Sequence, residues 1–155
     1  MSQQKIFLKA AWRNLLIANY TCNEEILKKY LPAHTELDTF NGQHLISLVA
    51  FQFLETKVLG IKFPFHTNFP EVNLRFYVKY NDKGTWKRGV VFIKEIVPKT
   101  MITFVANTFF NENYETMSMA QQVAIKQDAI YANYTWGKAN VFSAIADTQK
   151  VAMKD

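Results

Sequence analysis

The 155-residue sequence predicts an α+β fold built mainly from antiparallel strands. One observation is the strict alternation of apolar and polar residues over 72–80, which is typical of a strand with one apolar face. Another is the turn chemistry of residues 81–85, where Gly84 allows that strand and residues 88–97 to pair as a hairpin. The third is that helical spacing is confined to two short segments, 23–31 and 99–110.

The first half of the chain predicts two strands around a short helix. Residues 8–20 fit either a strand or a buried helical turn, and the strand is favoured. Asn23 is a helix cap, and Pro32 ends the short amphipathic helix that follows. The dipeptide Asn41-Gly42 predicts a second hairpin. Residues 45–54 are apolar on both faces, which indicates a central strand covered on both sides.

The second half continues with a loop, a helix and weaker strands. Residues 58–70 contain Pro64 and Pro70 and predict a loop that leads into the central hairpin. Pro98 opens a helix over 99–110. Residues 114–148 alternate weakly, and the segment 137–140 predicts a hairpin between the last two strands. No repeat or linker is visible, so we expect a single domain over 1–155, with about 147–155 as a frayed tail.

Composition narrows the classes of function. Hydrophobic residues make up 49% of the chain, enough for one substantial core. The net charge of +5 is dispersed, with no run of more than two basic residues, so we expect a solvated basic surface and no nucleic-acid partner. Cys22 is the only cysteine, which favours a reducing, cytoplasmic setting. No window approaches the roughly 18 apolar residues of a membrane span, so no membrane partner is expected.

Several stretches of the sequence together resemble a known family. They are AWRNLL (11–16), ANY (18–20), LP followed by ELD (31–38), NFPEVNLRFYV (68–78) and RGVVFIKEIVP (88–98). They resemble the YqjF-like family, domain of unknown function 2071. The resemblance implies the acetoacetate-decarboxylase-like fold, a cone or barrel of mainly antiparallel strands with a few short helices outside. Because family members usually continue for several dozen residues beyond residue 155, we expect a different closure or an edge that another copy covers.

The resemblance also implies where a reactive lysine would lie. In the decarboxylase that gives the fold its name, an interior lysine forms an imine after an adjacent lysine and desolvation lower its pKa. The candidate here is Lys94, but its neighbours Ile93 and Glu95 are not lysines, and the next lysine is Lys99. An ordinary solvated or ion-paired lysine is therefore favoured over an imine-forming one.

The polar face of residues 71–79 carries the main candidate site. Glu71 and Arg75 share this face, about 13 Å apart along a strand, so they cannot pair directly. If the face lines the interior, Arg75 can hold a carboxylate or phosphate bidentately, and Glu71 can act as a base or accept a hydrogen bond. If the face is solvated, both are ordinary surface residues. Asn73 and Tyr77 share the face and favour the interior.

Two further residues are kept as candidates for the pocket. Arg13 follows Trp12 and is either a second pocket cation or a structural arginine stacked on an aromatic ring. His66 precedes Glu71 in the loop. The three histidines and Cys22 show no metal-ligand spacing, so no metal is expected. The sequence also has no glycine-rich phosphate loop and no nucleophile motif, so we expect no cofactor.

Three hypotheses follow. The preferred one is a module that binds a small acidic or carbonyl-containing molecule through Arg75 and Glu71 in a β-cone pocket, without covalent chemistry. The alternative is a decarboxylase-like or other carbonyl-chemistry enzyme that uses Lys94 or Glu71. The third is an assembly protein that forms a homo-oligomer through an exposed strand edge.

Overall fold

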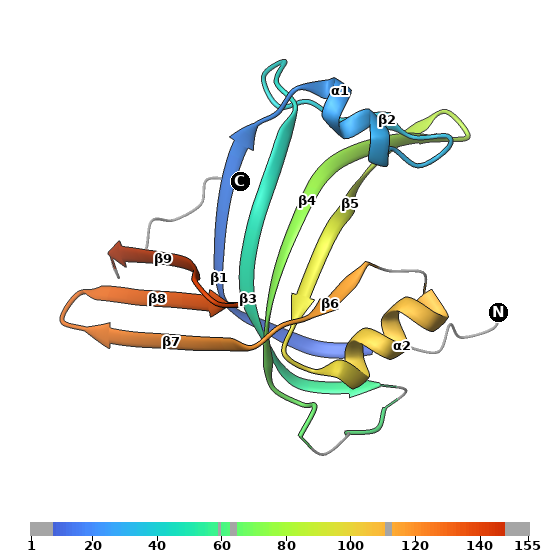
Figure 1. Cartoon of the computed structure of the whole chain (residues 1–155). Coiled ribbons are helices and arrows are strands. Elements are labelled where there is room, and N and C mark those ends of the chain that lie inside the picture. The colour runs from blue at the N-terminus through green and yellow to red at the C-terminus, as the bar shows by residue number, and fades with distance from the viewer. Residues whose placement is uncertain (1–7, 59, 63–64, 111–112, 148–155) are drawn as a thin grey trace.

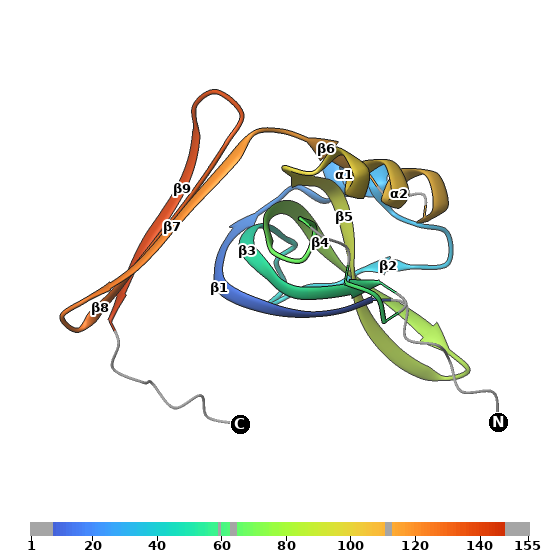
Figure 2. The ribbon, with the colours of Figure 1, turned by 90° about the horizontal axis from the view of Figure 1, so that it is seen from below.

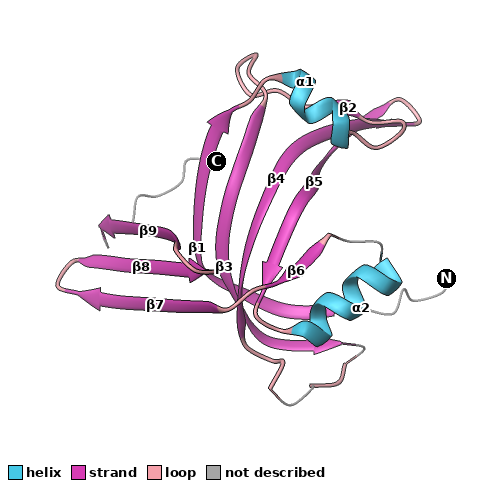
Figure 3. Cartoon of the chain, in the orientation of Figure 1, coloured by secondary structure: helices cyan, strands magenta, loops and turns pink. Residues whose placement is uncertain are grey.

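Two β-sheets form the body of the structure, a computed structural model that describes residues 8–58, 60–62, 65–110 and 113–147 (Figure 1). The larger sheet contains β1 (Leu8–Thr21), β2 (Glu36–Leu37), β3 (Leu45–Val58), β4 (Phe69–Asp82), β5 (Thr85–Val97) and β6 (Tyr114–Thr116). The smaller sheet contains β7 (Met119–Lys126), β8 (Ala129–Trp136) and β9 (Asn140–Asp147). The helices are α1 (Glu24–Leu27), continued by the 3₁₀ turn η1 (Lys28–Tyr30), and α2 (Thr100–Phe110). Figure 3 shows how far strands predominate, as the sequence predicts.

The larger sheet is strongly curved and has the strand order β1-β3-β4-β5-β6, with β2 beside β4. All its pairs are antiparallel except β5 with β6. Helix α2 and β6 lie on the concave side of the curve, and the β7–β9 sheet packs against the convex side (Figures 1 and 2). The curvature accompanies bulges in β1, between Lys9 and Ala11 and between Arg13 and Leu16, and another in the β4–β5 pair.

The larger sheet does not close in the part of the chain that the structure describes. Among the described residues, β1 pairs with β3 on one side only and β6 pairs with β5 on one side only. The expectation of a closed barrel is therefore wrong, whereas the mainly antiparallel architecture with two short helices is confirmed. The expected position of the helices outside the strands does not hold for α2, which packs on the concave side of the sheet. The third hypothesis, assembly through an exposed strand edge, stays a prediction; among the described residues, β1 is an edge strand. It carries exposed Trp12, Leu15, Ile17 and Tyr20.

Strand β3 is buried on both faces, as the sequence predicts. On the concave side, Val49, Phe51 and Phe53 form a core with Phe69 and Val97, and α2 contributes Ile102. On the convex side, Ala50 packs with Val72 and with two residues of β8, Ala132 and Tyr134. A third cluster covers the other end of the convex face, where Leu27 of α1 packs on Phe76 and Val78. The sheet is thus a layer with one core on its concave side and two on its convex side.

The two predicted turns differ in outcome. Lys83 and Gly84 have φ of 52° and 89° and join β4 to β5, which confirms the central hairpin. Asn41 and Gly42 also form a tight turn, with φ of 50° and 76°, but only Phe40 and Gln43 pair across it. The second hairpin is therefore wrong. Its first strand, β2, pairs with β4 at Lys79 and Val78, just beyond the last residue of β4 that β3 covers.

The remaining predicted elements are largely confirmed. Residues 8–21 form a strand, and the Asn23 side chain accepts a hydrogen bond from the Glu25 amide at 2.9 Å to cap α1. Helix α2 begins at Thr100, shortly after Pro98, and residues 137–139 turn β8 into β9. Pro64 in the predicted loop and the tail after residue 147 lie outside the described residues. In the described part of the chain, no helix has the length and apolar character needed to cross a membrane.

One hydrogen bond ties the smaller sheet to β1. Tyr134 of β8 is fully buried, and its hydroxyl donates to the backbone oxygen of Asn14 at 2.7 Å. Asn14 has φ of 54° within the β1 bulge.

We expect Tyr134→Phe to lower the free energy of unfolding by about 1 kcal/mol, because it removes one buried hydrogen bond and leaves the Asn14 carbonyl without its donor. Tyr131→Phe is the matched control, since Tyr131 lies on the same strand with an exposed side chain. Urea unfolding of both variants provides the measurement. Equal stability of the two variants would contradict the assigned role of this contact.

Candidate functional site

The polar side of β4 faces the concave side of the sheet. In the β3–β4 register, Glu71 lies opposite Phe51, Asn73 opposite Val49 and Arg75 opposite Ser47. Directly paired residues of antiparallel strands project to the same face, so these polar residues share the face of the aromatic core. The sequence predicts this grouping of Glu71, Asn73, Arg75 and Tyr77, and the structure brings them into one row that faces the interior of the curve.

A buried acidic cluster occupies one end of the row. Glu71 and Glu95 are only 2% and 3% exposed, and Asn73, the cross-strand partner of Glu95, is 2% exposed. The Asn73 amide donates to Glu71 Oε1 at 2.9 Å, and the Tyr114 hydroxyl donates to Glu71 Oε2 at 3.2 Å. Both oxygens of Glu71 therefore accept hydrogen bonds, which is how a buried carboxylate is stabilised.

Tyr114 lies beside two carboxylates. Burial raises the pKa of the Tyr114 hydroxyl well above its ordinary value, and the charges of Glu71 and Glu95 raise it further, because all three effects oppose formation of a phenolate. Tyr114 is therefore a neutral hydrogen-bond donor throughout the physiological pH range. Its position follows from the parallel pairing of β6 with β5, which places Tyr114 beside Glu95.

Arg75 occupies the middle of the row. Its Nε atom is buried and has no hydrogen-bond partner, and no ion pair with any other described residue engages the guanidinium. Its cross-strand neighbours are Ser47 on β3 and Phe92 on β5. An arginine that is half-buried without an acidic partner is unusual, because desolvating a cation costs free energy that a partner normally offsets.

Lys94 does not join this row. Lys94 pairs with Leu74, just before the bulge in the β4–β5 pair. Because Leu74 projects to the convex side, Lys94 projects there too. The Lys94 ammonium forms an ion pair with Glu115 at 2.6 Å, and both side chains are more than a third exposed. The candidate lysine is thus separated by the sheet from Glu71 and Arg75.

Arg13 and His66 are also placed apart from Arg75. Arg13 is exposed and lies opposite Gln52, which puts it on the convex face. His66 is half-buried in the loop before β4. Within the described ranges, no three side chains of His, Cys, Asp or Glu gather in a way that could hold a metal ion.

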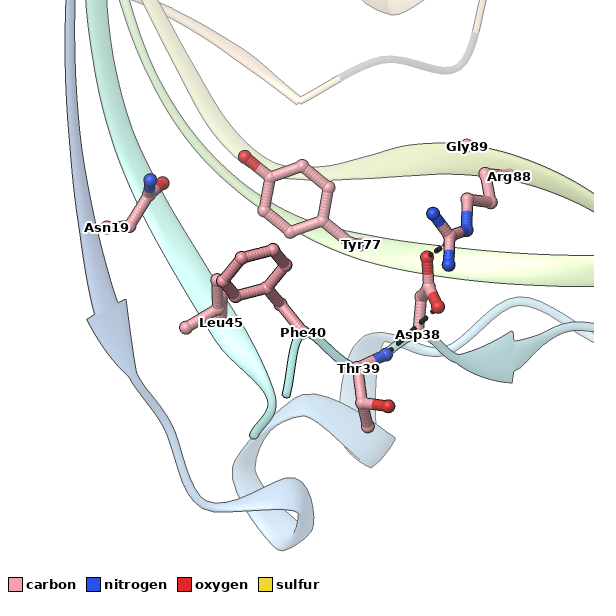
Figure 4. Close-up of a pocket in the computed structure, with 8 residues that line it drawn as sticks. All are labelled: Asn19, Asp38, Thr39, Phe40, Leu45, Tyr77, Arg88 and Gly89. Atoms are coloured by element: carbon pink, nitrogen blue, oxygen red, sulfur yellow. Dashed lines mark hydrogen bonds and ion pairs between the residues drawn. The ribbon is translucent and has the colours of Figure 1, made fainter. Parts of the chain in front are cut away.

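A cavity of about 360 Å³ opens at the other end of the row (Figure 4). Tyr77, Asn19, Leu45 and Phe40 line it together with Thr39, Gly89 and the ion pair between Asp38 and Arg88. The Ser47 hydroxyl donates to Asn19 Oδ1, so the Tyr77 hydroxyl, 2.7 Å from Ser47 Oγ, must donate to Ser47. Ser47, which lies opposite Arg75 in the register, is therefore hydrogen-bonded to two residues of the cavity wall.

Sequence reasoning missed several residues of this face. Glu95 enters the sequence analysis only as a neighbour of Lys94 that is not a lysine, whereas the structure places it opposite Asn73 on the concave face. Asp38 and Arg88 are 50 positions apart and carry no shared motif, so their 3.0 Å ion pair has no signal in the sequence. Tyr114 reaches Glu71 only because β6 returns parallel to β5 after α2, which no local pattern predicts.

The curved sheet with helices at its flanks places the chain in the acetoacetate-decarboxylase-like fold class. A crystal structure of acetoacetate decarboxylase from Legionella pneumophila aligns with a TM-score of 0.60 and 12% identity, covering 84% of this chain and 45% of that one. An acetoacetate decarboxylase-like enzyme from Sphingomonas wittichii RW1 aligns with a TM-score of 0.57 and 11% identity, covering 86% and 54%. At such low identity the likeness shows the fold alone.

The sequence comparison then specifies the family. Residues 9–153 match the model of domain of unknown function 2071, described as an uncharacterized conserved protein, and the chain belongs to this family. It is 35% identical over 109 residues to the uncharacterized protein YqjF of Bacillus subtilis strain 168, covering 69% of this chain. The match covers 43% of YqjF, so the chain spans about half the length of the proteins it resembles.

Proposed function

We propose that the protein binds a small carboxylate on the concave face of its larger sheet, with the Arg75 guanidinium as the anion-binding group. The observation that carries the proposal is the buried Arg75 Nε, which has no hydrogen-bond partner among the described residues. A carboxylate that accepts two parallel N–H bonds matches the planar fork of arginine. Such a ligand would supply both the missing acceptor and the missing negative charge.

Glu71 has a supporting role in this proposal. Its two oxygens already accept hydrogen bonds from Asn73 and Tyr114, and its negative charge would repel an anionic ligand placed against it. The acidic cluster therefore limits how far the carboxylate can move along β4 from Arg75. The preference for an acidic ligand rests on Arg75, with Glu71 as a boundary of the site.

The proposal contains no covalent step. An imine with a ligand on the concave face would need a lysine there that is not already engaged. Lys79 shares the strand face of Tyr77 but forms an ion pair with Glu36 at 3.6 Å, and Lys94 lies on the other side of the sheet and pairs with Glu115. We therefore expect borohydride reduction in the presence of a ketone to leave the mass of the protein unchanged. A mass increase localised to Lys94 would favour the enzyme hypothesis instead.

The proposal is tested by calorimetric titration with short carboxylates such as propionate and butyrate. We expect Arg75→Gln to weaken binding about tenfold to a hundredfold, since hydrogen bonds to charged groups contribute about 1.5–3 kcal/mol. Arg75→Lys should recover only part of the loss, because lysine keeps the charge but lacks the fork.

The matched control is Arg13→Gln, the same change on the opposite face of the sheet. It should alter binding less than twofold. If no carboxylate binds the wild-type protein, or if Arg13→Gln weakens binding as much as Arg75→Gln, the proposal is wrong.

A further inference from the structure

We infer that the ligand is an aromatic carboxylate whose ring enters the cavity between Phe40 and Tyr77; this inference rests on the proposed function of Arg75. The cavity of about 360 Å³ lies at the low end of the range of about 300–1,000 Å³ that is usual for small-molecule sites. That volume suits a single ring system rather than a nucleotide. Figure 4 shows the rings of Phe40 and Tyr77 turned toward the same space.

Phe40 is the first reason for an aromatic ligand. Its side chain is 67% exposed, although large apolar residues normally gain stability from burial. Its backbone is nevertheless held in place, because Phe40 and Gln43 exchange two backbone hydrogen bonds of 2.9 and 3.0 Å across the Asn41-Gly42 turn. Asp38, two residues earlier, is anchored too, since its amide donates to the Tyr77 carbonyl at 3.0 Å. An exposed ring on a backbone that is fixed in this way is well suited to stacking on a ligand.

Tyr77 is the second reason. Its hydroxyl is held by Ser47, which in turn is bound to Asn19, so the phenol ring cannot swing out of the wall of the cavity. Tyr77 thus offers a fixed aromatic surface opposite Phe40. Two aromatic rings in the wall of the cavity favour a planar apolar group over a flexible chain, because a planar group stacks on them and loses less of its own freedom on binding.

The ion pair at the far end of the cavity explains why the ring should carry no second charge. Asp38 forms an ion pair with Arg88 Nε at 3.0 Å and accepts a hydrogen bond from the Thr39 amide at 3.0 Å. The acid and the base neutralise each other, so this end provides no net charge for a charged substituent. Charge recognition is left to Arg75.

The spacing between Arg75 and the cavity sets the length of the ligand. Tyr77 lies two residues after Arg75 on the same strand face, which is roughly 7 Å along the strand. A carboxylate on Arg75 and a ring beside Tyr77 therefore need a short linker between them. An arylpropionate such as 3-phenylpropionate has the required arrangement, whereas benzoate is too short to reach both.

Calorimetric titration with 3-phenylpropionate and propionate tests this inference, because the two acids share the carboxylate and differ in the ring. We expect 3-phenylpropionate to bind at least about tenfold more tightly, and Phe40→Ala to remove about tenfold of its affinity while leaving propionate within twofold. Phe104→Ala is the control, since Phe104 on α2 is similarly exposed at 63% and does not line the cavity.

The outcomes separate the two proposals. If both acids bind equally and depend on Arg75, or if Phe40→Ala and Phe104→Ala act alike, the aromatic inference is overturned and the carboxylate site stands. If neither acid binds, the proposed function itself fails. Ligand-induced NMR shifts of the Phe40 and Tyr77 ring protons, present with 3-phenylpropionate and absent with propionate, would support the assigned position of the ring.

Discussion

Raising the pH above 10 is expected to destabilise the protein steeply. Burial raises the pKa of Tyr134 to about 12, whereas a tyrosine in the unfolded chain ionises near 10. Between these values the folded protein holds a proton that the unfolded chain has lost, so stability is complete below pH 10 and decreases as the pH rises toward 12. One such group costs about 1.4 kcal/mol per pH unit. Tyr114, whose pKa is also raised, acts in the same direction.

The measurement is urea unfolding at a series of pH values from 8 to above 10. In the variant Tyr134→Phe, the free energy of unfolding should decline less steeply with pH than in the wild-type protein, because phenylalanine has no proton to lose. The double variant Tyr134→Phe/Tyr114→Phe should show a still shallower decline. The control Tyr131→Phe removes an exposed tyrosine and should keep the wild-type slope. A decline that is identical in all four proteins would refute the assignment.

The substitution Phe51→Ala is expected to lower the free energy of unfolding by about 3–5 kcal/mol. Phe51 is 1% exposed, and its ring centroid lies 4.7 Å from that of Trp12 and 5.0 Å from that of Phe53. Removing the ring leaves a cavity that the paired strands cannot close, since β3 is held between β1 and β4. The cavity would also lie opposite Glu71 in the register, so the acidic cluster should lose its tight packing.

Phe65→Ala is the matched control for this substitution, because Phe65 is 87% exposed in the loop before β4. Surface substitutions of this kind usually change stability by less than about 0.5 kcal/mol. Urea unfolding of the two variants side by side gives the comparison. A loss below about 1 kcal/mol for Phe51→Ala would show that the concave core is less closely packed than the structure indicates.

Local patterns were sufficient to predict most of the elements. The alternation of β4, the Gly84 turn, the double burial of β3 and the helix after Pro98 all depend on neighbouring residues, and each is confirmed. The errors concern partners distant in the sequence. Whether the strands close into a barrel, and whether β2 pairs with β3 or β4, depends on tertiary packing that no window of residues contains.

The candidate site shows the same division. Strand periodicity groups Glu71, Asn73, Arg75 and Tyr77 on one face, and the structure confirms that grouping. Strand periodicity does not reveal that a bulge places Lys94 on the opposite face from these four residues, because the bulge arises from the pairing of β4 with β5. The partners of Glu71 and the cavity beside Tyr77 come from loops and from a parallel strand, so they become visible only when the chain is folded.

The hydrogen bond from Tyr134 to Asn14 joins residues 120 positions apart in the chain, which has a kinetic consequence. The β7–β9 sheet is a meander with short turns and can form from local contacts, but its docking surface needs β1, β3 and β4 already assembled. The entropy cost of closing long loops must be met before the contacts of the docked sheet can stabilise the fold. Folds dominated by such contacts reach the native state in about milliseconds to seconds. We therefore expect the smaller sheet to be the last unit to acquire its native packing.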